Sequence, residues 1–237
     1  AYLFLKAQGL AGKLVADIRI DGAGKKVTRS DNCRVSDLSV SSDNLTFTYE
    51  AKSLPYPIDT SYYDNEKHTQ ADALSVIPFM DEMNYEGLSV SGLSDGYYGL
   101  TIGGEFIGRF TARELERGIN MALLQNTPQY KQAMKIRQMN EERWLKERKM
   151  REFYWVEYNL MRKTGMLWAC DEAAVDTLRK YRPHDIFLQW NGDLWLQYMH
   201  KGIREDCVNE QQDLVDRIYE QNKPIPLQIE IKKFTDL

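Results

Sequence analysis

The first part of the chain alternates hydrophobic and polar residues over short runs that end in turn residues. A period of two is typical of strands with one buried face. The pattern predicts strands over residues 13–20, 34–40 and 45–50, the last two joined as a hairpin across residues 41–44. Residues 53–72 lack this period and contain prolines and tyrosines, so we expect them to form a long ordered loop.

The alternation returns after this loop. Apolar and polar residues alternate over residues 88–90, 97–102 and 106–110, with Gly-rich connections at 92–96 and 103–104. Short Gly-rich connections commonly join neighbouring antiparallel strands. The segment is therefore predicted to form a three-stranded meander.

Local signals mark two helix starts beyond the meander. Thr111 is followed three residues later by Glu114, which is the spacing of a capping box and predicts a helix over residues 112–125. Thr127 is a candidate N-cap residue. Pro128 would then occupy the first helical position, where the N–H that proline lacks is not needed. One long helix or a broken pair of helices is therefore predicted over residues 128–163.

The remainder of the chain continues the helical pattern. Asp171 is expected to cap a helix over residues 172–181, and a further helix is predicted over residues 206–222. Residues 227–232 alternate apolar and polar side chains again and predict a final strand.

These elements predict an α+β fold, with a β-rich N-terminal half of small antiparallel sheets and a mainly helical C-terminal half. Residues 1–10 have the pattern of the end of an apolar helix, which we assign to a preceding domain. Residues 11–110 are assigned to a β-rich domain. Residues 111–237 are assigned to a helical region with a short final strand.

The composition supports a globular chain and disfavours some partners. The 237 residues are 43% hydrophobic, and the net charge is −4 with both signs mixed along the helices. The sequence therefore has no basic stripe for nucleic acid or an anionic membrane surface. It contains no signal peptide pattern and no apolar run of the roughly 20 residues that a membrane-spanning helix needs.

The cysteines and histidines do not predict a metal or a cofactor. Cys33, Cys170 and Cys207 are odd in number and far apart, which argues against a zinc site and allows at most one disulfide. The three histidines lack the i,i+4 or His-x-His spacing of metal ligands, so surface or helix-end positions are expected for them. No cofactor is therefore predicted.

One motif resembles a catalytic signature. Residues 92–96 match G-x-S-x-G, the pattern of a nucleophile elbow, which requires a strand before the serine and a helix after it. Here the alternation of a strand follows instead. A hairpin turn is the favoured interpretation, and Ser94 is not predicted to be a nucleophile.

Aromatic residues form the candidate surface for a substrate or a partner. The residues are Tyr56, Tyr62 and Tyr63 in the long loop, and Trp190 and Trp195 in the helical half. Such side chains stack against sugar rings in some proteins, but a set at helical spacing is more often part of a core. The helical half also contains Phe153, Tyr154, Trp155, Trp168 and Tyr198, and packing is the favoured interpretation for this aromatic cluster as a whole.

Several segments resemble the C-terminal part of bacterial SGNH/GDSL-type hydrolases, the GDSL-like lipase/acylhydrolase family. The resemblance covers most of the chain from Val76, and the matching segments are 76–79, 84–88, 90–96, 98–108, 110–120 and 127–133. It implies an upstream α/β/α domain with a Ser nucleophile, a His base, an orienting Asp and an oxyanion hole. Many members are secreted, so a secreted or periplasmic location is expected.

The catalytic blocks of that family are missing from this sequence. It has no Gly-Asp-Ser block, and Asn65, Tyr181 and Gln197 stand where an Asp-x-x-His block would need Asp. The sequence therefore predicts no catalytic residue in this chain, which alone is expected to be inactive. The predicted function is that of the C-terminal region of a serine hydrolase of carbohydrate or other carboxyl esters, with the upstream domain as partner. The alternative is a non-catalytic module that binds a glycan or a protein.

Overall fold

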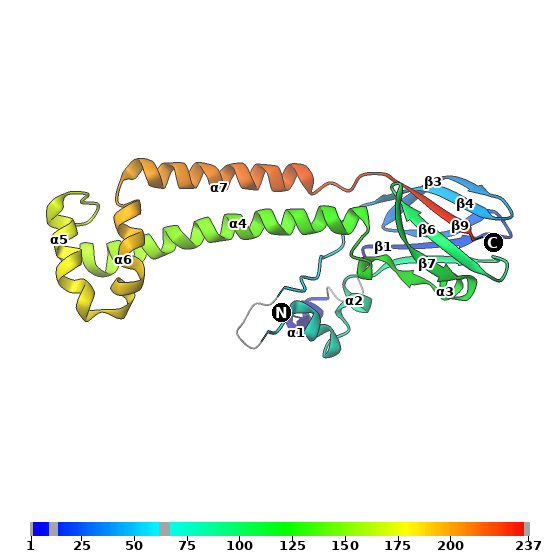
Figure 1. Ribbon diagram of the computed structural model, residues 1–237, viewed down its shortest axis with the longest axis horizontal. Coiled ribbons are helices and arrows are strands. Elements are labelled where there is room, and N and C mark those ends of the chain that lie inside the picture. The colour runs from blue at the N-terminus through cyan, green and yellow to red at the C-terminus, as the bar shows by residue number, and fades with distance from the viewer. Residues whose placement is uncertain (1, 10–13, 62–66, 235–237) are drawn as a thin grey trace. The chain divides into compact units, whose positions relative to one another are not determined.

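The computed structural model describes residues 2–9, 14–61 and 67–234. It has the α+β fold predicted, with a β-rich N-terminal half and a helical C-terminal half (Figure 1). The chain divides into two compact units. The β unit contains Ala1–Lys135 and Asn222–Leu237, and the helical unit contains Ile136–Gln221.

The β unit contains a four-stranded sheet in the order β2-β1-β5-β8. Its strands are β1 (Ala16–Asp21), β2 (Lys26–Asp31), β5 (Glu86–Ser91) and β8 (Ile119–Asn120). Strand β1 pairs antiparallel with β2 and parallel with β5. The expectation of purely antiparallel sheets is therefore wrong for this pair.

The second sheet of the β unit is five-stranded, in the order β3-β4-β9-β6-β7. Its strands are β3 (Cys33–Val40), β4 (Asn44–Ala51), β6 (Tyr97–Ile102), β7 (Glu105–Thr111) and β9 (Leu227–Lys233). The predicted hairpin of β3 and β4 is confirmed. The final strand β9 is also confirmed, and it lies at the centre of the sheet, paired antiparallel with β4 and β6.

One hydrophobic core joins side chains from both sheets. Ile18 and Leu88 come from the first sheet, and Phe47, Leu100 and Ile231 come from the second. Each is at most 1% exposed. Burial of one such side chain stabilises the fold by roughly 1.5–3 kcal/mol, so this core is a main stabilising element of the β unit.

The predicted three-stranded meander is correct only for its last two strands. β6 pairs with β7, whereas β5 pairs with β1 in the other sheet. The connection turns at Gly92, where φ is 73° and an added Cβ would lie 2.9 Å from the backbone nitrogen of Ala23. Only glycine fits this close approach in a left-handed conformation, which lets the chain leave one sheet and enter the other.

Short helical elements complete the β unit. They are α1 (Tyr2–Ala7), η1 (Gln70–Ser75), α2 (Phe79–Glu82), α3 (Ala112–Arg117) and η2 (Met121–Leu123). The capping box before α3 is confirmed: Thr111 Oγ1 accepts the Glu114 N–H at 3.2 Å, and Glu114 Oε2 accepts the Thr111 N–H at 2.7 Å. The helix ends at Arg117 rather than residue 125, because Gly118 has a φ of 94°.

The helical unit is built from longer elements. They are the greater part of α4 (Pro128–Val156), the π-helical turn η3 (Glu157–Met161), α5 (Glu172–Tyr181), η4 (Arg182–His184), α6 (Ile186–Tyr198) and α7 (Lys201–Gln221). Helix α4 begins at Pro128 as predicted, and the Thr127 hydroxyl accepts the Tyr130 N–H at 3.3 Å. Asp171 caps α5 as predicted, through the Ala174 N–H at 3.0 Å.

The predicted division of the chain at residue 111 differs from the observed one. The segment before Ile136 and the last strand both belong to the β unit. The strand hydrogen bonds of β9 to β4 and β6 place the end of the chain in the sheet, although it follows the helices in sequence. Helix α7 begins at Lys201 rather than residue 206, and α6 was not predicted.

The helices of the described residues are all too short or too polar to cross a bilayer. The three cysteines are free, with Cys33 and Cys207 buried and Cys170 exposed.

Candidate functional site

The predicted aromatic surface is divided between the two units. Tyr56 lies in the long loop of the β unit, is 49% exposed and meets the ring of Phe79 edge-on at 5.6 Å between centroids. Tyr62 and Tyr63 lie outside the described residues. Trp190 is 68% exposed on α6 of the helical unit. Of these residues, Tyr56 and Trp190 are therefore exposed on separate units.

Trp195 is not a surface residue. Its side chain is fully buried in the helical core, and its indole Nε1 donates to Glu157 Oε1 at 2.8 Å. The prediction that Trp195 could contact a ligand is wrong, and packing explains this residue. The helical spacing of the aromatic residues correctly indicated that Trp195 is a core residue, but it did not indicate the hydrogen bond of its indole.

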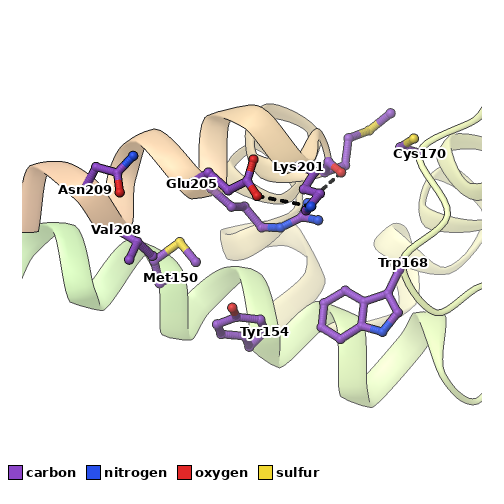
Figure 2. A pocket seen from close by; sticks show the side chains of 10 residues that line it. Met150, Tyr154, Trp168, Cys170, Lys201, Glu205, Val208 and Asn209 are labelled. Carbon is purple, nitrogen blue, oxygen red and sulfur yellow. Dashed lines mark hydrogen bonds and ion pairs between the residues drawn. The ribbon is translucent and has the colours of Figure 1, made fainter.

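The helical unit contains a pocket that the sequence did not predict (Figure 2). Its volume is about 560 Å³. Helix α4, the segment before α5, the end of α6 and the first turns of α7 contribute its walls. The lining residues are Met150, Tyr154, Trp168, Cys170, Met199, Lys201, Arg204, Glu205, Val208 and Asn209.

One wall of this pocket is aromatic. Tyr154 and Trp168 meet edge-to-face with centroids 6.0 Å apart, and Tyr158 also meets Trp168 edge-to-face at 6.0 Å. Trp168 is 45% exposed. Figure 2 shows the Tyr154 and Trp168 rings next to each other on this side of the pocket.

The opposite wall is polar and comes from α7. Lys201, Glu205 and Asn209 recur at intervals of four residues, so they lie along one face of the helix. Lys201 Nζ forms an ion pair with Glu205 at 3.1 Å. Helix α7 is held beside α4 by the ion pair of Lys146 and Glu210 at 2.6 Å.

Arg204 links the two walls. Its Nη1 donates to the carbonyl oxygens of Tyr198 and Met199, at 2.7 and 2.6 Å, and so satisfies backbone acceptors at the end of α6. Its guanidinium carbon lies 4.8 Å from the ring centroid of Phe153 and 5.9 Å from that of Trp168. Cation–π attraction at these distances steadies the Trp168 ring.

Trp168 is held in an unusual backbone conformation. Its φ is 65°, a left-handed value that is uncommon for a bulky residue. The Trp168 N–H donates to Glu157 Oε2 at 2.9 Å. Glu157 is fully buried and begins the π-helical turn, a local distortion that is frequent at functional sites. Backbone strain of this kind persists where the surrounding structure fixes it.

The β unit contains an apolar cavity, here called the Tyr56 cavity. Its volume is about 560 Å³, and α1, the long loop, η1 and α2 contribute to it. The lining residues are Tyr2, Leu5, Tyr56, Ile58, Gln70, Ala73, Leu74, Ile77, Phe79 and Met83. The Tyr2 hydroxyl donates to Glu82, and Lys6 forms an ion pair with the same carboxylate. The walls otherwise favour an apolar group.

A buried carboxyl group lies in the core of the β unit. Glu86 Oε1 accepts from the Tyr49 hydroxyl at 2.8 Å and from Gln129 Nε2 at 3.3 Å. Glu86 Oε2 and Gln129 Oε1 have no hydrogen-bond partner among the described residues. Burial raises the pKa of Glu86 to about 7, against the smaller opposing effect of its hydrogen bonds. This group is enclosed and does not face either pocket.

The G-x-S-x-G segment does not form a nucleophile elbow. Ser94 lies in the connection from β5 to β6, so no helix N-terminus stands behind it to stabilise an oxyanion. Lys233 Nζ donates to Ser94 Oγ at 2.7 Å, and the Tyr98 hydroxyl lies 3.1 Å from the same oxygen. The prediction of a hairpin turn is wrong, because the segment connects β5 of one sheet to β6 of the other.

The histidines and acidic residues add no further centre. His68, His184 and His200 are exposed, as the sequence predicted for surface or helix-end positions. Within residues 2–9, 14–61 and 67–234, no group of His, Cys, Asp and Glu has the arrangement of a metal site.

The sequence contained a partial signal for the helical-unit pocket. Glu157 directly follows the run Phe153-Tyr154-Trp155-Val156. An acid beside so many apolar residues indicates a buried carboxylate that accepts hydrogen bonds. No local pattern shows that its partner is the backbone of a residue eleven positions away. The sequence does show Trp168 as one of the aromatic residues of the helical half, but not that it lines a pocket.

Comparison with known proteins gives two related similarities. The family described as diltiazem deacetylase C-terminal helical domain matches residues 134–223. The solved structure of a gut microbial diltiazem-metabolizing enzyme is 38% identical, with a TM-score of 0.91 over 98% of this chain and 53% of that chain. No curated protein matches the sequence. The chain therefore shares its fold with about half the length of that enzyme.

Proposed function

We propose that this chain is the C-terminal region of an ester hydrolase that removes acetyl or other short acyl groups. The observation that carries the proposal is the similarity to a diltiazem-metabolizing enzyme across both units at 38% identity. The helical unit adds support, because its matching family is named for a deacetylase. Removal of an acetyl group from an oxygen is hydrolysis of a carboxyl ester.

We further propose that the catalytic machinery is of the SGNH type and is supplied by an upstream part of the protein. The resemblance of the segments around Thr111 and Thr127 to that family supports this assignment. Ser94 lacks the geometry of a nucleophile elbow, as described above. A Ser nucleophile, a His base and an orienting Asp from the upstream domain would then perform the acyl transfer. By the same resemblance, we propose a secreted or periplasmic location.

The Tyr56 cavity supports a role for the β unit in binding the ester. Its aromatic and aliphatic lining suits the apolar part of an acyl or alcohol group. Phe79 contacts Tyr56 edge-on and so holds one wall in place. Carbohydrate esters and other carboxyl esters are both within the proposed substrate class.

The proposal is tested by comparing the purified chain with a longer polypeptide that includes the sequence encoded before it. Hydrolysis of p-nitrophenyl acetate and deacetylation of diltiazem are followed with and without a serine-reactive phosphonate. We expect phosphonate-sensitive turnover by the longer polypeptide and none by the chain alone. Sensitive turnover by the chain alone would overturn the upstream assignment. Absence of turnover by both proteins on a panel of acetyl esters would overturn the hydrolase itself.

A further inference from the structure

The helical-unit pocket combines two chemically different walls. Tyr154 and Trp168 offer ring surfaces on one side, while Lys201, Glu205 and Asn209 offer donors and acceptors on the other (Figure 2). The pocket volume of about 560 Å³ is within the range of small-molecule sites. A ligand of this pocket must therefore have an apolar face and a polar edge.

The polar wall disfavours a purely aromatic or aliphatic ligand. Such a ligand would remove water from Lys201, Glu205 and Asn209 without replacing the lost hydrogen bonds, and leaving polar groups unpaired is costly. A hydroxylated ring avoids this cost, because each hydroxyl group both donates and accepts. Lys201 donates, Glu205 accepts and Asn209 does both, so together they offer partners to hydroxyl groups along a ligand.

The charges of the pocket do not favour a strongly charged ligand. Lys201 and Glu205 neutralise each other in their 3.1 Å ion pair. The Arg204 guanidinium is engaged by the backbone carbonyls of Tyr198 and Met199 and stands over aromatic rings. A neutral ligand therefore fits the pocket without competing for the Lys201–Glu205 ion pair or for the carbonyl contacts of Arg204.

The aromatic wall is fixed before any ligand arrives. The bond from the Trp168 N–H to the buried Glu157 carboxylate holds the backbone, and Arg204 and Tyr154 contact the ring. A ring surface that is already ordered loses little conformational entropy when it binds. This arrangement suits the weak stacking of an apolar ring face against Trp168.

We propose that the pocket binds a neutral sugar ring, with the ring face stacked on Trp168 and its hydroxyl groups facing Lys201, Glu205 and Asn209. The site lies wholly within the helical unit, so its occupancy does not depend on ester hydrolysis. The inference therefore goes beyond the proposed function and is tested separately from it.

The test measures binding of neutral oligosaccharides to the complete 237-residue chain. Calorimetry and ligand-observed NMR follow the titration of xylotetraose, cellotetraose, mannotetraose and chitotetraose. p-Nitrophenol serves as an aromatic probe that has no hydroxyl-rich ring. We expect at least one oligosaccharide to bind with a dissociation constant of about 1 mM or below. We expect p-nitrophenol to bind about tenfold more weakly or worse, because it cannot replace the polar contacts that a sugar makes.

Variants then locate the site. Trp168→Ala is expected to weaken sugar binding by about tenfold or more, and Asn209→Ala, at an exposed position, by about threefold to tenfold. Trp190→Ala is the matched control, because Trp190 is more exposed than Trp168 and does not line the pocket. It is expected to bind like the parent. Asn209→Ala keeps the test informative if Trp168→Ala fails to fold.

Three results would overturn the proposal. The first is the absence of binding by every oligosaccharide at about 10 mM, a concentration that detects very weak sites. The second is sugar binding that persists unchanged in both Trp168→Ala and Asn209→Ala. The third is tighter binding of p-nitrophenol than of any sugar, which would assign the pocket to aromatic ligands.

Discussion

Glu157 fixes the backbone of Trp168: its Oε2 accepts the Trp168 N–H at 2.9 Å, at a residue whose φ is 65°. The other oxygen accepts the indole N–H of Trp195 at 2.8 Å. One buried carboxylate therefore joins a core tryptophan to a pocket tryptophan. The structure of the helical core and the shape of its pocket depend on the same side chain.

Replacing Glu157 with Ala is expected to destabilise the helical unit by about 3 kcal/mol. The change leaves two donors unpaired, and each buried unpaired group costs roughly 1–3 kcal/mol. Urea unfolding followed by tryptophan fluorescence measures the loss. The control is Glu152→Ala on α4, whose ion pair with Arg148 is at the surface and is expected to contribute less than about 1 kcal/mol. Equal effects of the two variants would contradict the role assigned to Glu157.

Glu86 is expected to make the stability of the β unit depend on pH. Its pKa is about 7 in the folded protein and 4.5 in the ordinary reference state, so the folded state binds the proton more tightly. The contribution of protonated Glu86 to the free energy of unfolding is therefore complete below pH 4.5 and is lost as the pH rises to about 7. The loss amounts to about 3 kcal/mol at roughly 1.4 kcal/mol per pKa unit.

The variant Glu86→Gln tests this dependence. It removes the ionisable group but keeps an oxygen near Tyr49 and Gln129, so the fall in stability between pH 4.5 and 7 should disappear. The free energy of unfolding is measured by urea titration across this range. Glu116→Gln, at an exposed position of α3, serves as control and should keep the parental slope. A slope unchanged in Glu86→Gln would exclude Glu86 as its source.

Thr111→Ala is expected to lower the free energy of unfolding by about 1 kcal/mol. The substitution removes the hydroxyl that accepts the Glu114 N–H and so breaks the capping box of α3. Thr111→Ser retains the hydroxyl and should recover most of the loss. The comparison is made by thermal and urea unfolding, and a serine variant as unstable as the alanine variant would show that the cap is not the cause.

Ser94→Ala is expected to leave ester hydrolysis by the longer polypeptide unchanged. Ser94 bonds to Lys233 and Tyr98 in a turn between sheets, and no element behind it stabilises an oxyanion. The rate constant for p-nitrophenyl acetate and the extent of phosphonate labelling should both match the parent. A large fall in either quantity in a folded variant would make Ser94 the nucleophile.

Local signals were sufficient to predict several elements. Thr111, Thr127 and Asp171 act within three residues along the chain, so their capping bonds could be inferred from spacing alone. Long-range pairing could not be inferred in this way. Tyr49 pairs with Leu227 in the centre of the second sheet, and nothing near either residue specifies the other. The central position of the last strand in the second sheet could not be predicted for that reason.

The candidate site was less accessible to prediction than the fold. Trp195 and Trp190 belong to the same helix, yet one is fully buried and the other is 68% exposed, because α6 turns one face to the core. The position of Trp168 in the pocket depends on its left-handed backbone and on its hydrogen bond to the distant Glu157 carboxylate. Neither feature has a sequence signature. The sequence shows the aromatic residues of the helical half, Trp168 among them, but does not show which of them face a pocket.

The central claim is that catalysis resides outside this chain. Mapping the serine that forms a phosphonate adduct in the longer polypeptide tests it most directly, by digestion and mass spectrometry of the labelled protein. The account predicts one adduct, on a serine that precedes Ala1, with no label on residues 1–237. A labelled serine within the 237 residues, Ser94 included, would contradict it.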